Sequence, residues 1–163
     1  MLSSSEISQL IKNSIPFVPQ LTEGIVVKVY DGDTITIVSK LPYDSSPLYK
    51  FSVRINNVDC PEIKGSGDDE KQCAKLAKQR VTDLILNKRI EVRNIGTEKY
   101  GRVLADVLID GQDIGTLLVN ERLALRYNGG TKQRPVSWLK YYQSGEMEWI
   151  NSVYKINYFY LFF

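Results

Sequence analysis

The 163 residues, of which 43% are apolar and 25% are charged, have the size and composition of a single globular domain with an ordinary core. The chain has no histidine, which excludes Ser-His-Asp and Cys-His catalysis and any zinc site that uses imidazole. The net charge of +2 is unevenly spread, because residues 1–70 hold six Lys/Arg against ten Asp/Glu and residues 71–102 hold nine against three. A basic surface beside carboxylates suits a polyanionic ligand at a metal site, although a solvated helix face has the same pattern.

The N-terminal segment lacks the basic start and the apolar run of a signal peptide. We read residues 1–20 as an N-terminal appendage with weak helical spacing. The two cysteines, Cys60 and Cys73, are too few for a disulfide framework and are interpreted as reduced thiols. These features predict a soluble intracellular protein.

Two β-branched runs flank Asp31-Gly32, which is the strongest short-range signal for a β-hairpin. Asp31 and Asp33 fit a turn, and that structural role would by itself explain both residues. Residues 39–50 contain two prolines and two adjacent serines, so we expect a loop there.

The segment 51–62 is an alternating strand that runs into charged residues. Its apolar residues share one face, so Arg54 is predicted on the other face, pointing away from the core. Pro61 cannot donate a backbone hydrogen bond to a neighbouring strand. The strand is therefore expected to stop near Asp59 and to present Asp59 and Glu62 at its end. A salt-bridged strand end would explain this charge cluster as well as a functional site would.

Apolar residues at three- and four-residue spacing predict an amphipathic helix over 69–87, with lysines along its outer face. Residues 89–95 and 102–109 read as strands, and the second of them places Arg102 at its first residue. A second helix is expected over 112–125. A third helix follows the capping residue Ser137 and carries aromatic residues that are expected in the core: Trp138, Tyr141, Tyr142 and Trp149.

Five strands with a helix between the third and the fourth indicate an α+β protein, a five-stranded Greek-key barrel of the OB type with three α-helices. We place this domain at residues 21–155. The apolar tail, residues 156–163, is too short to span a bilayer. We expect a monomer without a membrane span.

With the elements placed, residues 24–132 resemble the staphylococcal nuclease (thermonuclease-like) family. Three motifs occur in the family's order: D-G-D-T at 31–34, R-I-N-N-V-D-C-P-E at 54–62 and E-K-Y-G-R at 98–102. Together, with a helix between the second and the third, they are highly specific. The resemblance implies an OB barrel and calcium-dependent cleavage of phosphodiester bonds in DNA and RNA.

Residue by residue, the resemblance implies a metal site made by the carboxylates of Asp33 and Asp59 and the backbone carbonyl of Cys60. It implies three catalytic residues: Arg54, Glu62 and Arg102. It also implies contacts to the phosphate of bound nucleotide from Lys99 and Tyr100, and an approximate counterpart of a late substrate-binding tyrosine in Tyr127. The loop at 39–50 is longer than in the short bacterial form.

The chemistry of these residues is coherent without the family. Hard carboxylate and carbonyl oxygens select Ca²⁺, with Mg²⁺ as the alternative ion, and Glu62 could then accept a proton from the attacking water. Arg54 and Arg102 offer planar donors to a charged phosphate. A second function class stays open, a non-catalytic nucleic-acid or protein-binding module. A plain single-strand binder would need neither Glu62 nor two arginines at strand ends.

Overall fold

The computed structural model describes residues 1–65, 67–98 and 100–149. Three of the sequence predictions fall outside these residues, namely the role of Lys99, the domain end at residue 155 and the apolar tail at 156–163. Within the described part of the chain, no helix has the length and the apolar composition that crossing a bilayer requires.

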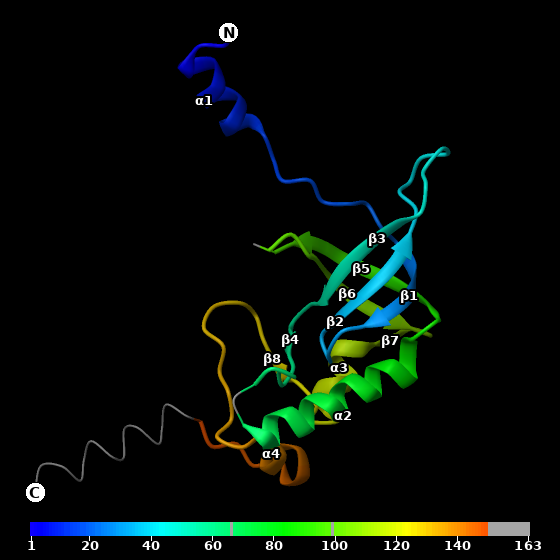
Figure 1. The fold of residues 1–163 in the computed structure, drawn as a ribbon, viewed down its shortest axis with the longest axis vertical. Helices are drawn as coiled ribbons and strands as arrows, with labels where there is room; N and C mark the ends of the chain where they lie inside the picture. Colours follow the sequence, from blue (N-terminus) through cyan, green and yellow to red (C-terminus); the bar gives the residue numbers. More distant parts are fainter. Residues whose placement is uncertain (66, 99, 150–163) are drawn as a thin grey trace, which may run out of the picture.

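Five strands form a closed barrel (Figure 1): β1 (Glu23–Val29), β2 (Thr34–Ser39), β3 (Tyr49–Ile55), β5 (Arg89–Thr97) and β6 (Val103–Ile109). Antiparallel pairing gives the order β3-β2-β1-β5-β6, and a parallel pairing between β3 and β6 closes it. In that pairing Val53 lies opposite Val103 and Ile55 lies opposite Ala105. The predicted five-stranded OB-type barrel is thus confirmed.

Three helices accompany the barrel, as predicted: α2 (Asp68–Ile85), α3 (Ile114–Asn120) and α4 (Trp138–Ser144). The predicted second helix was too long at its C-terminal end. It stops at Asn120, and β8 (Leu125–Arg126) instead pairs with β4 (Val58–Asp59). The short strand β7 (Gln112–Asp113) extends the sheet beyond β6, and Asp113 then caps α3 by accepting a hydrogen bond from the Thr116 backbone N–H.

The main core fills the barrel and the space under α2. Period-2 alternation sends residues such as Val26, Ile35 and Val53 inward, where each is fully buried. The helical face of Ala77 and Val81 packs on the same cluster. A smaller cluster between α2 and α4 contains four buried residues: Cys73, Leu125, Trp138 and Tyr141. It confirms that Trp138 and Tyr141 are core residues, and both cysteine thiols are free and buried.

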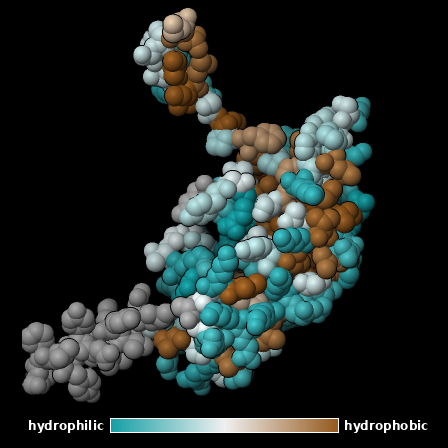
Figure 2. Space-filling model, viewed as in Figure 1, coloured by the Kyte–Doolittle hydropathy of each residue, from teal (hydrophilic) through white to brown (hydrophobic). Residues whose placement is uncertain are grey.

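A fourth helix in the described residues, α1 (Ser4–Asn13), lies in the predicted appendage and stands away from the barrel (Figure 1). A reciprocal capping box between Ser3 and Glu6 starts it. None of its residues is buried. Figure 2 shows apolar side chains gathered along α1, and they include Ile7, Leu10 and Ile11. The division of the chain at residue 20 stays a prediction.

Candidate active site

Arg54, at the end of β3, is the centre of the charged cluster. It lies on the strand face opposite Val53 and Ile55, as period-2 geometry requires, but it does not face solvent. Only 8% of it is exposed. The predicted face of Arg54 is thus the observed one, but the side chain is buried there because Asp33 and Asp59 pair with its guanidinium.

Asp33 and Asp59 are both buried and both paired with Arg54. One guanidinium nitrogen forms an ion pair with Asp33, and the other lies 3.2 Å from Asp59 Oδ1 and 3.1 Å from the carbonyl oxygen of Val58. The Cys60 backbone N–H donates to Asp33 Oδ2 at 3.2 Å. Burial opposes the charge on Arg54, but the two carboxylates outweigh it and raise the pKa of the guanidinium.

Asp31 lines the same cavity as Asp33 and Arg54, although its sequence pattern indicates only a turn. Its Oδ1 is buried and has no hydrogen-bond partner among the described residues. Burial, followed by the nearby charge of Asp33, raises the pKa of Asp31 to about 6. The D-G-D motif gives no local signal that distinguishes a turn aspartate from a site aspartate, because both follow the same hairpin pattern.

A pH-dependent stability follows from the raised pKa of Asp31. A carboxyl group whose pKa is higher in the folded state favours folding at low pH, and that contribution disappears as the pH rises through about 6. In EDTA, Asp31→Asn should melt a few degrees higher than wild type at pH 8 and at nearly the same temperature at pH 4. Thermal melts at both pH values check this, and an equal difference at both would contradict it.

Glu62 lies on the loop after β4 and its side chain is partly exposed. Two cations from the segment before α4 reach it, since Lys132 Nζ lies 3.2 Å and Arg134 Nη2 lies 2.8 Å from Glu62 Oε1. Lys132 Nζ also lies 2.7 Å from Asp59 Oδ1. Buried Glu70 accepts a hydrogen bond from the Glu62 backbone N–H at 3.2 Å and lies 3.6 Å from Arg134. Glu62 is thus held by three residues that the sequence analysis did not single out.

Arg102 immediately precedes β6 and is half-buried. Glu98 holds it through two hydrogen bonds, one of them a 3.0 Å contact from Nη2 to Glu98 Oε2. Its Nη1 donates to Thr34 Oγ1 at 3.1 Å, and the Thr34 hydroxyl in turn donates to Asp33 at 3.0 Å. The hydrogen bonds that Arg102 donates to Glu98 raise the pKa of its guanidinium, and they outweigh the opposing effect of burial. Thr34 therefore links Arg102 to the Asp33–Arg54 pair.

One cavity of about 880 Å³ brings the predicted residues together. Its lining includes Asp33, Arg54, Cys60, Glu62, Tyr100, Arg102 and Tyr127. Asp59 lies beside it, paired with Arg54 and Lys132. Tyr100 is largely exposed, whereas the Tyr127 hydroxyl donates to the carbonyl oxygen of Gly130 at 2.9 Å. The position of Lys99 is outside the described residues.

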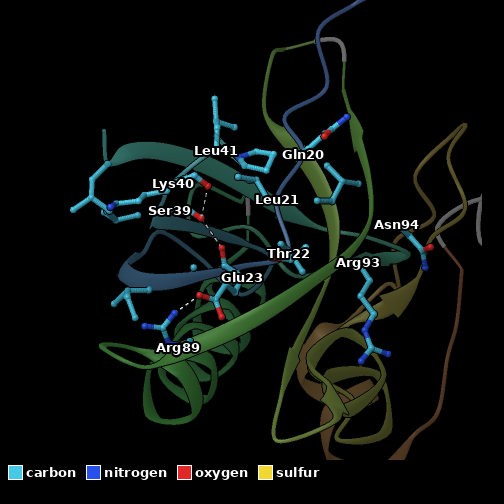
Figure 3. Close-up of a pocket in the computed structure, with 17 residues that line it drawn as sticks. Gln20, Leu21, Thr22, Glu23, Ser39, Lys40, Leu41, Arg89, Arg93 and Asn94 are labelled. Carbon is cyan, nitrogen blue, oxygen red and sulfur yellow. Dashed lines mark hydrogen bonds and ion pairs between the residues drawn. The ribbon is translucent and has the colours of Figure 1, made fainter. Parts of the chain in front are cut away.

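A second hollow of about 730 Å³ lies at the opposite end of β1 (Figure 3). Its lining combines apolar residues such as Leu21 and Leu41 with polar groups bonded to one another. Glu23 pairs with Arg89, and its carbonyl oxygen accepts a 2.7 Å hydrogen bond from the Ser39 hydroxyl. Since the motif residues Asp33, Arg54, Glu62 and Arg102 line the cavity at the other end of β1, that cavity is the candidate active site.

A family model described as staphylococcal nuclease homologue matches residues 52–144, more than half of the chain. The chain belongs to this family. The matched segment contains Arg54, Asp59, Glu62 and Arg102, whereas Asp31 and Asp33 precede it.

Three similar proteins carry the word endonuclease in their names. The chain is 30% identical to an uncharacterized endonuclease of Haemophilus influenzae over 63% of this chain and 51% of the relative. It is 30% identical to endonuclease YncB of Bacillus subtilis over 64% and 49%, and 28% identical to the probable endonuclease LCL3 of Phaeosphaeria nodorum over 57% and 33%. The chain thus spans about half or less of the length of these relatives.

Proposed function

We propose that this chain is a metal-dependent nuclease that hydrolyses phosphodiester bonds of DNA or RNA. The observation that carries the proposal is the convergence of Arg54, Glu62 and Arg102 on the cavity that Asp33 also lines. Two guanidinium groups and a carboxylate suit a phosphate and its attacking water. The endonuclease names of the relatives support the same reaction class.

The donor set fits a hard cation, and we propose Ca²⁺, with Mg²⁺ as the alternative. The orphaned Oδ1 of Asp31 beside Asp33 supports this assignment, because a buried carboxylate oxygen without a partner is costly unless a positive charge meets it. Asp33, Asp59 and the Cys60 carbonyl would hold the ion. The bound ion supplies Lewis-acid neutralisation of a phosphate oxygen.

The protein's own groups divide the remaining work. Glu62 accepts a proton from the attacking water, and its ion pairs with Lys132 and Arg134 fix its position at the rim of the cavity. Arg102, oriented by Glu98 and Thr34, presents its guanidinium to the phosphate as charge develops there. Arg54 also presents its guanidinium to the phosphate. At the same time it neutralises the carboxylates of Asp33 and Asp59.

Divalent ions are expected to control activity. The purified protein, stripped of metal, should cleave plasmid DNA or an RNA transcript when Ca²⁺ is added and should be inactive in EDTA, and Zn²⁺ should serve less well because the donors are hard oxygens. Gel-based digestion assays measure this. As a control, Glu91→Gln on β5 removes an exposed carboxylate outside the cavity and should not change the ion dependence. Full cleavage in EDTA would contradict the proposal, and binding without cleavage under every condition would favour a non-catalytic module.

A further inference from the structure

A further, polar hollow extends from the candidate active site across the outside of β1, β2 and β3. Strands β1, β2 and β3 are neighbours in the barrel (Figure 1). Their register places Lys28 opposite Thr36 and Thr36 opposite Ser52, so these three polar residues form a row across the strands. The hollow has a volume of about 250 Å³. We call this surface, made of Lys28, Tyr30, Thr36 and Ser52, the polar shelf.

The polar shelf is continuous with the active-site cavity. Lys28, Tyr30 and Arg102 line both hollows. A polyanion whose phosphate meets Arg102 can therefore continue onto the shelf without leaving the protein surface. None of the roles proposed above for metal binding or for catalysis uses Lys28 or Tyr30.

Tyr30 is the aromatic member of the shelf. Half of it is exposed, although it directly follows β1 and lies close in the chain to the buried Asp33. Its backbone N–H donates to the Thr34 carbonyl oxygen at 2.9 Å, and this hydrogen bond holds the backbone from which the tyrosine side chain projects. The ammonium group of Lys28 lies 5.9 Å from the centre of its ring. An exposed ring with an adjacent cation is the combination that holds a stacked nucleobase and its phosphate on single-stranded nucleic acid.

We propose that Tyr30 and Lys28 form a nucleotide subsite that takes one unpaired nucleobase and its phosphate next to the bond that is cleaved. This inference rests on the nuclease function proposed above. The base stacks on Tyr30, the ammonium group of Lys28 meets the phosphate, and the Thr36 and Ser52 hydroxyls border the sugar. A base inside a duplex is already stacked between its neighbours, so the subsite favours single-stranded substrates.

The test compares Tyr30→Ala with Tyr30→Phe, which keeps the ring. Tyr43→Ala is the matched control, since it removes a tyrosine of similar exposure from the loop between β2 and β3. The substrates are short single-stranded oligonucleotides, each with one nucleobase replaced by an abasic sugar at a different position, and the intact parent. Cleavage gives kcat and KM, and fluorescence anisotropy in the Glu62→Gln background gives Kd without turnover.

Tyr30→Ala should raise KM and Kd for the intact oligonucleotide about tenfold and leave kcat nearly unchanged. Tyr30→Phe and Tyr43→Ala should show the same KM and Kd as the protein without these substitutions. When the abasic sugar stands at the position whose base would stack on Tyr30, Tyr30→Ala should no longer raise KM or Kd. An equal penalty at every position, or none at all, overturns the subsite while leaving the nuclease function standing. Absence of cleavage by the wild type defeats the nuclease function instead, and the Kd values still decide whether the subsite binds a base.

Discussion

Glu62→Gln is expected to lower the turnover number by about two to four orders of magnitude while nucleic-acid binding persists. The glutamine oxygen can still accept hydrogen bonds from Lys132 and Arg134, so the loop around residue 62 keeps its position. What is lost is the group that takes the proton from water. Single-turnover cleavage of a short oligonucleotide measures the effect, with circular dichroism to verify the fold.

Arg102→Ala provides the companion measurement. The substitution removes the guanidinium that donates hydrogen bonds to the phosphate as charge develops there. It should therefore lower the single-turnover rate constant of cleavage as well. Because both residues serve one transition state, the double variant should be less impaired than the product of the two single effects. Wild-type rates for Glu62→Gln would mean that another group is the base, or that the cavity binds nucleic acid without cleaving it.

Arg54→Ala is expected to cost about 3–5 kcal/mol of the free energy of unfolding in EDTA. The substitution leaves Asp33 and Asp59 buried without the guanidinium that now bridges them. Arg54→Lys should lose less, because a single ammonium group restores the charge without reaching both carboxylates as a planar fork does. Urea denaturation with and without Ca²⁺ measures these losses, and Ca²⁺ should restore part of the stability of Arg54→Ala.

Arg93→Ala is the control for Arg54→Ala. Its partner Glu91 is exposed, and a surface ion pair of this kind contributes about 0–1 kcal/mol. If Arg54→Ala is no more destabilising than Arg93→Ala, then Asp33 and Asp59 do not depend on Arg54 for charge compensation. If Ca²⁺ raises the free energy of unfolding by the same amount in wild type and in Arg54→Ala, then the ion does not compensate for the charge that Arg54 supplies to Asp33 and Asp59.

The barrel could be predicted from the sequence because its signals are local. The hairpin around Asp31-Gly32 and the alternation in β3 and β6 each depend on residues within one strand or turn. The end of α3 was misplaced since Leu125 continues its apolar spacing, and only the pairing of Leu125 with Asp59 shows it to be in a strand. Tertiary pairing there overrides local spacing.

The charged cluster was predictable in membership but not in geometry. The motifs identified Arg54, Glu62 and Arg102, and alternation gave the strand face on which Arg54 lies. Alternation did not indicate that carboxylates from two other segments bury Arg54 on that face. Lys132 and Arg134 reach Glu62 from about seventy residues further along the chain, in a stretch without periodicity. No pattern in the sequence reports such long-range ion pairs.

The parallel pairing of β3 with β6 has a consequence for how the chain can be shortened or assembled. Val53 and Val103 are fifty positions apart, so the ring stays open until β6 has been made. Before that point β3 and β5 each have an unpaired backbone edge of the kind that recruits strands from other molecules. Fragments ending before Val103 are therefore expected to aggregate, and the closure step, which joins distant segments, sets a slow rate for refolding of the intact chain.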